Sequence, residues 1–143
     1  VGKITAARAT LAGSSGGCQA ECGAAAAMGA AALVAMRSGN PEAVASAVAL
    51  TFKSVLGLVC DPVGGLVESP CIKRNATLVS LGSLAADLAL AGVKSLIPAD
   101  EVVDTMGQVG RALPESLRET ARGGLAVSPT GRSLAARLEE GTS

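Results

Sequence analysis

The feature that most limits how this chain can fold is its large supply of small, helix-forming residues. Alanine is the most frequent residue, and the run 23–36 contains no charged side chain. Alanine favours helices because its side chain loses no entropy there and crowds no neighbouring turn. Runs of aromatic and β-branched residues, which are typical of strands, are missing. We therefore predict an all-α fold, a compact Ala-rich multi-helix bundle.

Capping and helix-breaking residues divide the chain into predicted helices. Asn40, Pro41 and Glu42 combine an N-cap, a proline at the first helical position and an acid in the first turn. Asn75 is predicted to cap a later helix in the same way. With no linker long enough to divide the chain, residues 1–143 are predicted to form a single domain. The predicted helices cover 1–11, 19–36, 41–58, 75–91, 98–110, 114–123 and 132–140.

Charge and hydropathy argue against two classes of partner. The 12 basic residues equal the 12 acidic ones, so there is no net field to attract nucleic acid or an anionic membrane. The uncharged run 23–36 is short for a membrane span, and the longer apolar run 76–93 carries Asp87 near its middle. The start of the sequence does not resemble a secretory signal. We expect a cytoplasmic protein that binds neither membrane nor nucleic acid.

The chain contains no histidine. A mechanism that needs an imidazole base or a Cys–His pair therefore cannot be completed by this chain alone. An active site here requires other groups, a metal centre or residues from elsewhere.

Three of the four cysteines stand in loops. Cys18 follows a Gly/Ser loop at the predicted start of a helix, where backbone amides favour a thiolate. Cys60 and Cys71 bracket a loop rich in Gly and Pro, residues that permit close backbone approach and fix the direction of the chain. Cys22 lies inside the Ala-rich helix, where a buried small apolar role is the preferred interpretation and a spare thiol near a site is the alternative.

The residues alone leave the role of the loop thiols open. Buried core packing, a disulfide, a Cys₄ zinc site and an iron–sulfur centre all remain possible. A disulfide is disfavoured in a chain that looks cytosolic. Zinc sites normally use close cysteine pairs such as C-x₂-C, and the spacings here are wider. Spacing by itself favours no one metal.

Six segments of this sequence, taken in order, resemble a known family. Together they resemble the α chain, or α domain, of the iron–sulfur-dependent L-serine dehydratases. The segments are GGCQAE (16–21), LGLVCDPV (56–63), GLVE (65–68), PCIKRNA (70–76), IP (97–98) and LRETARGGLA (117–126).

The resemblance implies a cofactor and an activity. It implies that Cys18, Cys60 and Cys71 are the three protein ligands of a [4Fe–4S] cluster, which leaves one iron open to the substrate. That iron would act as a Lewis acid on the hydroxyl and carboxylate of L-serine, without net redox change. The implied reaction of this lyase is the conversion of L-serine to pyruvate and ammonia.

The family's α portion is about twice as long as this chain, and its Ser/Thr-Gly-Gly-Asp-type segment lies upstream of the matching part. The chain therefore resembles the C-terminal half. Expected partners are the N-terminal half of the α chain, a β chain or β domain, and further copies in an oligomer. We expect the general base to lie outside this chain, so the isolated chain should be inactive.

Polar residues next to Cys71 are the candidates for substrate binding. Arg74 is the candidate for the substrate carboxylate, because a guanidinium can pair with it bidentately, and Lys73 and Asn75 flank it. The alternative is an ordinary solvated helix start capped by Asn75. Gln19 and Glu21 follow Cys18, and each could orient either the cysteine loop or the substrate. For Glu21 the preferred interpretation is a first-turn acid that complements the helix dipole.

A second class of function also fits the sequence. The chain could be a non-catalytic helical subunit whose iron–sulfur cluster is structural or senses redox state. A catalytic cluster should respond to the substrate in its spectrum and lose activity in air, whereas a structural cluster should do neither.

Overall fold

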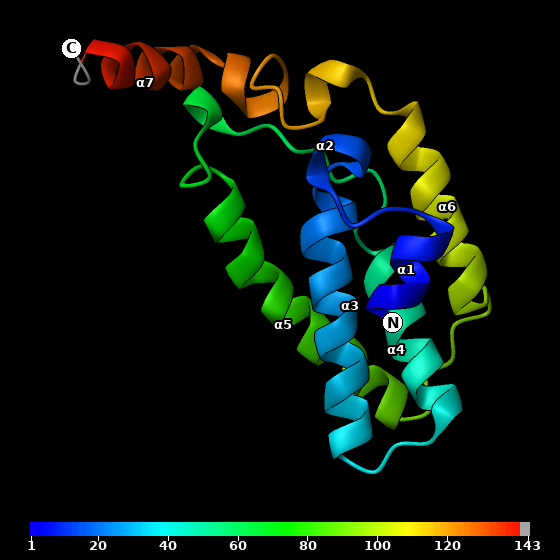
Figure 1. Ribbon diagram of the computed structural model, residues 1–143. Helices are drawn as coiled ribbons and strands as arrows, with labels where there is room; N and C mark the ends of the chain where they lie inside the picture. Colours follow the sequence, from blue (N-terminus) through cyan, green and yellow to red (C-terminus); the bar gives the residue numbers. More distant parts are fainter. Residues whose placement is uncertain (141–143) are drawn as a thin grey trace.

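The computed structural model describes residues 1–140, and the last three residues of the predicted domain, 141–143, lie outside this range. Within the described range the chain forms seven α-helices, three short 3₁₀ helices and no β-strand, so the predicted all-α fold is confirmed (Figure 1). In order the elements are α1 (Gly2–Arg8), α2 (Gly13–Gly16), α3 (Cys18–Met36), α4 (Pro41–Lys53), η1 (Val63–Gly65), α5 (Cys71–Leu90), α6 (Ala99–Ala112), η2 (Glu115–Leu117), η3 (Gly124–Val127) and α7 (Pro129–Glu140).

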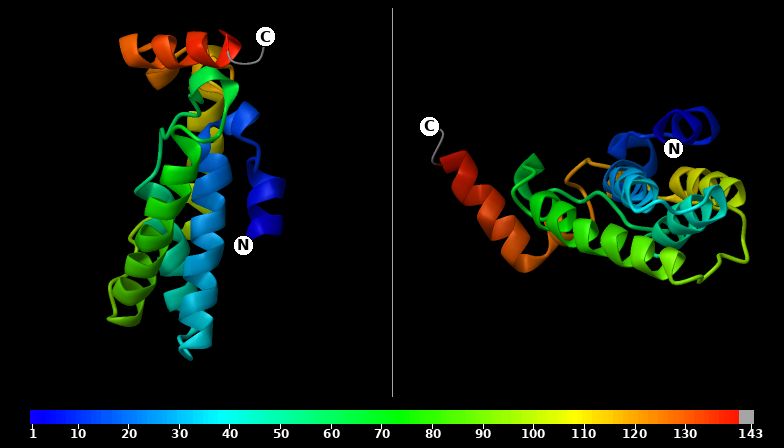
Figure 2. Two further views of the ribbon diagram at one scale, coloured as in Figure 1. Left: turned by 90° about the vertical axis from the view of Figure 1, so that its left-hand side faces the viewer. Right: turned by 90° about the horizontal axis from the view of Figure 1, so that it is seen from below.

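Helix α3 is the central helix of the bundle and contacts α1, α2, α4, α5 and α6 (Figure 2). Its buried alanines pack with Phe52 and Met106 on one side, in a cluster built with α4 and α6. On another side they pack against the buried alanines of α5. Because small side chains occupy these contacts, the helix backbones approach closely, as at Gly82, where an added Cβ would lie 2.9 Å from the carbonyl oxygen of Ala26.

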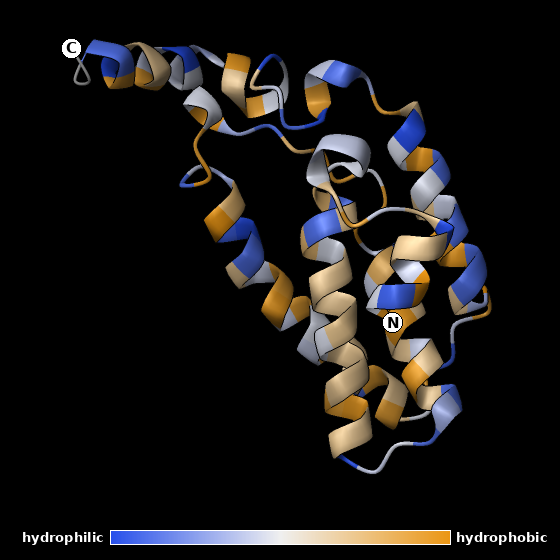
Figure 3. Cartoon of the chain, in the orientation of Figure 1, coloured by the Kyte–Doolittle hydropathy of each residue, from blue (hydrophilic) through white to orange (hydrophobic). Residues whose placement is uncertain are grey.

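Helix α3 is also long and apolar enough, by length and composition, to cross a membrane. More than half of its most apolar window is buried inside the protein, and α3 is apolar along most of its length (Figure 3). These contacts are those of a core helix.

Several predicted helix bounds are wrong. The predicted loop before Cys18 contains the short helix α2. Helix α4 begins at Pro41 with the Asn40 side chain accepting from Ala43 N at 2.8 Å, as predicted, but it ends at Lys53. The chain then turns through Gly57, whose φ of 83° lies in the left-handed region and cannot continue a right-handed helix.

The predicted helix 114–123 is wrong beyond its first turn. Only η2 forms, because Glu119 and Ala121 adopt positive φ angles of 66° and 54°. The backbone here pairs with Cys60 rather than with itself, forming an isolated parallel bridge between Cys60 and Arg118. A tertiary contact has therefore overridden the local helix signal.

The C-terminal helix α7 stands apart from the bundle. It contacts η1 and η3 and crosses one end of the molecule (Figure 1). The cysteine-bearing segments meet at this same end, so η1, η3 and the loop between Cys60 and Cys71 lie between α7 and the helices of the core.

Candidate metal centre

Three thiols that are distant in sequence converge at one end of the bundle. The Sγ atoms of Cys18, Cys60 and Cys71 all lie within 4.8 Å of one another. Cys18 and Cys60 are buried, Cys71 is partly exposed, and all four cysteines of the chain are free thiols. The structure thus brings together the three cysteines that the sequence singles out as ligands.

Each cysteine is placed by a different backbone feature. Cys18 is the first residue of α3, directly after Gly17, whose φ of 75° makes the sharp turn out of α2. A Cβ at Gly17 would lie 2.7 Å from the Leu58 carbonyl oxygen, so only glycine fits here. Cys60 is fixed by two backbone hydrogen bonds to the 117–119 segment. Its amide donates to Leu117 O at 2.9 Å, and its carbonyl oxygen accepts from Glu119 N at 2.7 Å.

Cys71 is the first residue of α5. This start differs from the prediction that Asn75 caps the helix: Asn75 lies inside the helix, and Pro70 occupies the N-cap position. The preceding loop is held by hydrogen bonds from Val63 N to Ser69 O at 2.8 Å and from Ile72 N to Val67 O at 3.0 Å. These bonds close the loop, and the helix begins at Cys71, four residues before the predicted start at Asn75.

Gln19 is a fully buried polar residue that joins the site to the core. Its amide nitrogen donates to Gly16 O at 2.9 Å and to Met106 O at 3.3 Å, and its amide oxygen accepts from Gly57 N at 2.9 Å. These bonds fix α2, α6 and the 54–58 turn around the start of α3. Of the two interpretations of Gln19, the geometry therefore favours orientation of the cysteine loops.

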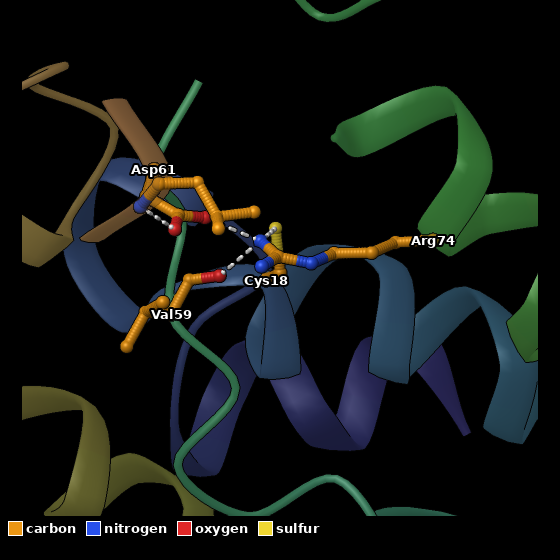
Figure 4. A network of polar contacts seen from close by, with 5 residues as sticks. Cys18, Val59, Asp61 and Arg74 are labelled. Carbon is orange, nitrogen blue, oxygen red and sulfur yellow. Dashed lines mark hydrogen bonds and ion pairs between the residues drawn. The ribbon is translucent and has the colours of Figure 1, made fainter. Parts of the chain in front are cut away.

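Arg74 and Asp61 form a polar network beside Cys18 (Figure 4). Arg74 Nη1 donates to Asp61 Oδ1 at 2.6 Å and to Val59 O at 2.9 Å, and it lies 3.9 Å from Cys18 Sγ. The Asp61 side chain is 3% exposed, and its Oδ2 accepts from Leu125 N at 2.7 Å. Sequence reasoning missed Asp61, although an acid directly after a loop cysteine, between apolar residues, is a usable signal.

The charges around the thiols favour one thiolate. Hydrogen bonds from Cys22, then from Cys60 and Arg74, outweigh burial and lower the pKa of Cys18 to about 6. Burial and the neighbouring Cys18 raise the pKa of Cys60, and burial raises that of Cys71. These directions favour ionisation of Cys18 before Cys60 or Cys71, because its neighbours donate hydrogen bonds to its thiolate.

Cys22 lies beside this group. It is buried in the apolar cluster that contains Cys18, Cys60, Val55 and Leu78. Its hydrogen bond to Cys18, with burial, raises its own pKa. Both interpretations of Cys22 thus describe part of the structure: it packs as a small apolar residue and is also a thiol next to the site.

Two carboxylates lie on the side of Cys60. A Cβ built on Gly13 would lie 2.8 Å from Glu21 Oε2, 3.5 Å from Glu119 Oε2 and 3.6 Å from Cys60 Sγ. Gly13 therefore leaves a space that both acids and the thiol border. Glu119 was not predicted as a site residue, because the loop that brings it to Cys60 replaces a predicted helix.

The other polar candidates lie differently. Lys73 Nζ donates to Glu68 O at 2.5 Å, so its ammonium group folds back on the loop. Asn75 is exposed and lines a groove between α3 and α5 that Cys22 also lines. The Nε atom of Arg118 is buried and has no hydrogen-bond partner within the described residues, on the segment paired with Cys60.

The donor set fits a metal or metal cluster held by sulfur. Soft thiolate ligands select zinc, copper(I) or iron–sulfur clusters. The adjacent Arg74 provides positive charge that favours thiolates. Three sulfur donors would leave a fourth coordination position of a metal or cluster without a ligand from these cysteines. Fold and site together define an all-helical protein with three converging cysteines that could bind a metal cluster.

Comparison with known proteins gives the family. The family model described as "Serine dehydratase alpha chain" matches residues 1–126. The chain belongs to the serine dehydratase alpha chain family.

Named relatives agree with this assignment. The chain is 55% identical, over 96% of its length, to the probable L-serine dehydratase alpha chain of Bacillus subtilis. It is 55% identical, over 94% of its length, to the L-serine dehydratase alpha chain of Peptoniphilus asaccharolyticus. L-serine dehydratase 1 of Escherichia coli is 39% identical over 89% of the chain. The aligned part covers 46% of each of the first two relatives and 28% of the third, so the chain spans about half of the α chains that it matches.

Proposed function

We propose that this chain is the cluster-binding part of an iron–sulfur-dependent L-serine dehydratase, which converts L-serine to pyruvate and ammonia. The observation that carries the proposal is the convergence of Cys18, Cys60 and Cys71 within 4.8 Å in a member of the serine dehydratase alpha chain family. The names of the similar proteins supply the reaction, and the thiol trio supplies a place for its cofactor.

The proposed cofactor is a [4Fe–4S] cluster held by Cys18, Cys60 and Cys71. When bound, such a cluster with one iron free of protein thiolate supplies a Lewis acid for the substrate's hydroxyl and carboxylate groups. The role of this chain is to hold the three thiolates on separate elements and to leave the fourth position free. Burial of Cys18 and Cys60 keeps the thiolates away from bulk water.

The charged groups around the trio support an amino acid as the substrate. Glu21 and Glu119 put negative charge near Cys60, which suits the ammonium group of a zwitterion. The sequence offers Lys73, Arg74 and Asn75 as candidates for substrate binding. Arg118 joins them because its Nε is a buried donor without a partner in the described part. A guanidinium there suits the substrate carboxylate.

The rest of the enzyme completes the proposed site. The aligned part covers less than half of the relatives' α chains, and we propose that the remainder of the α chain and a β chain or domain assemble on this bundle. The chain has no histidine, so we place the general base in one of those parts. Such a base contributes about 10²–10⁴-fold to the rate.

The test uses the intact protein, meaning this chain together with the rest of its α chain and the β chain or domain. It is reconstituted anaerobically with iron and sulfide, and L-serine is then added. The proposal predicts pyruvate formation, a change in the cluster spectrum on serine binding and loss of activity in air. A cluster that loads but does not respond to serine would instead support the second function, a structural or redox-sensing centre.

A further inference from the structure

The Arg74–Asp61 pair differs from the other ion pairs of the described residues in its burial. Its side chains are 19% and 3% exposed, whereas both partners in every other pair are at least 38% exposed. Exposed pairs contribute little to stability, while a buried charge is kept only where its partners are well placed. The placement of this pair therefore needs a separate explanation.

One nitrogen of this guanidinium, Nη1, makes three polar contacts. Arg74 Nη1 bonds Asp61 Oδ1 and Val59 O and faces Cys18 Sγ at 3.9 Å. Asp61 and Val59 flank Cys60 in the sequence, and Arg74 lies three residues after Cys71. Figure 4 shows Arg74 with Asp61, Val59 and Cys18. The two short bonds hold Nη1 at 3.9 Å from the Cys18 sulfur.

Asp61 is itself fixed from the far side. Its Oδ2 accepts from Leu125 N at 2.7 Å, and a Cβ at Gly124, where φ is +58°, would lie 2.3 Å from the same oxygen. The 124–125 turn therefore packs directly against the carboxylate and holds it on the side away from Arg74. This anchoring makes the distance between the guanidinium and Cys18 a property of the fold.

We infer that Arg74 is a positioning residue for the Cys18 thiolate, held in place by Asp61, and that it sets the electrostatics of a cluster bound there. This inference rests on the proposed function. It assigns Arg74 to a ligand sulfur instead of the substrate carboxylate. A cation at a ligand sulfur stabilises the more negative, reduced form of a cluster, and hydrogen bonds to sulfur are known to tune cluster potentials.

The experiment compares Arg74→Gln, Arg74→Lys and Arg37→Met in the intact protein, reconstituted anaerobically with ferrous iron and sulfide. Gln keeps an amide donor for Asp61 without the charge, and Lys keeps a charge. Arg37 is the matched control because it pairs with Asp87 of α5, as Arg74 of α5 pairs with Asp61, but that pair is exposed and far from the cysteines. The readouts are iron content, the one-electron reduction equilibrium against a dye, and KM for L-serine.

Loss of the Arg74 charge should make cluster reduction about tenfold less favourable, which is about 59 mV for one electron. Arg74→Lys should recover part of this shift, and Arg37→Met should show none. A reduction equilibrium of Arg74→Gln within about threefold of wild type would overturn the inference. A raised KM with that unchanged equilibrium would return Arg74 to the substrate carboxylate.

A second measurement covers the case in which Arg74→Gln does not fold. Pulsed electron paramagnetic resonance of the reduced wild-type cluster, with isotope-labelled arginine, should detect a guanidinium nitrogen coupled to the cluster. Absence of that coupling overturns the inference. If the wild-type protein binds no cluster at all, the proposed function and the inference both fail; if it binds one and deaminates serine without an Arg74 effect, only the inference fails.

Discussion

At the scale of single residues, the site depends on one thiolate whose charge its neighbours stabilise. The pKa of Cys18 is lowered to about 6, first by Cys22 and then by Cys60 and Arg74, while those of Cys22, Cys60 and Cys71 are raised. A lowered folded-state pKa contributes stability above the ordinary cysteine pKa, and this contribution is lost as the pH falls through the folded-state value. A thiol whose folded-state pKa is raised contributes stability below the ordinary cysteine pKa. That contribution is lost as the pH rises toward the folded-state pKa.

These directions predict a stability maximum for the metal-free protein. Its urea midpoint should rise from pH 6 to the ordinary cysteine pKa of about 8.5 and fall at higher pH. Cys22→Ala should weaken the rise, because it removes the largest cause of the low Cys18 pKa. A midpoint that does not change between these pH values would show that Cys18 is not a thiolate in the folded protein.

Gly124 tests the anchoring of Asp61. Its φ is +58° and its missing Cβ faces Asp61, whereas Gly65, with a φ of +74°, has no atom within 4 Å of such a Cβ. Both alanine variants should lose about 1–2 kcal/mol for the left-handed backbone. Gly124→Ala should lose about 1–3 kcal/mol more, for overpacking, in chemical unfolding. Equal losses would mean that Asp61 is free to move.

At the scale of elements, the sequence predicts most of the helices but not how the loops meet. Alanine content and the Asn40–Pro41 cap suffice for α3 and the start of α4. Helix α5 begins at Cys71 because hydrogen bonds within the 63–72 loop close that loop. Residues 118–123 are not helical, because Arg118 pairs with the distant Cys60. The cysteine trio was identified from family resemblance, whereas the roles of Asp61 and Glu119 depend on loop pairing that local propensity does not encode.

The close contact of α3 with α5 gives a prediction at this scale. Gly82→Ala would put a Cβ 2.9 Å from Ala26 O, and Gly29, on the neighbouring helix, has nothing within 4 Å of its Cβ position. Gly82→Ala should lose about 1–3 kcal/mol of unfolding free energy, because rigid backbone must move. Gly29→Ala should gain up to about 1 kcal/mol from helix propensity. Equal effects of the two variants would contradict close packing of α3 against α5.

At the scale of the whole molecule, the proposed function requires parts of an L-serine dehydratase that this chain does not contain. The aligned region is 46% of the similar α chains. We predict that this chain alone, reconstituted with iron and sulfide, binds a cluster but forms no pyruvate from L-serine. The measurement is a pyruvate assay with the intact protein as the positive control. Turnover by the chain alone would place the general base within it, with Glu119 and Glu21 the carboxylates beside Cys60.

The account depends most on the three cysteines as ligands of one cluster. The most direct test is the iron and sulfide content of the intact protein after anaerobic reconstitution, for wild type and for Cys18→Ala, Cys60→Ala, Cys71→Ala and Cys22→Ala. Wild type and Cys22→Ala should each bind about four iron and four sulfide ions, and each of the other three should lose most of both. Full loading of any one of those three variants, or a requirement for Cys22 equal to theirs, would contradict the assignment.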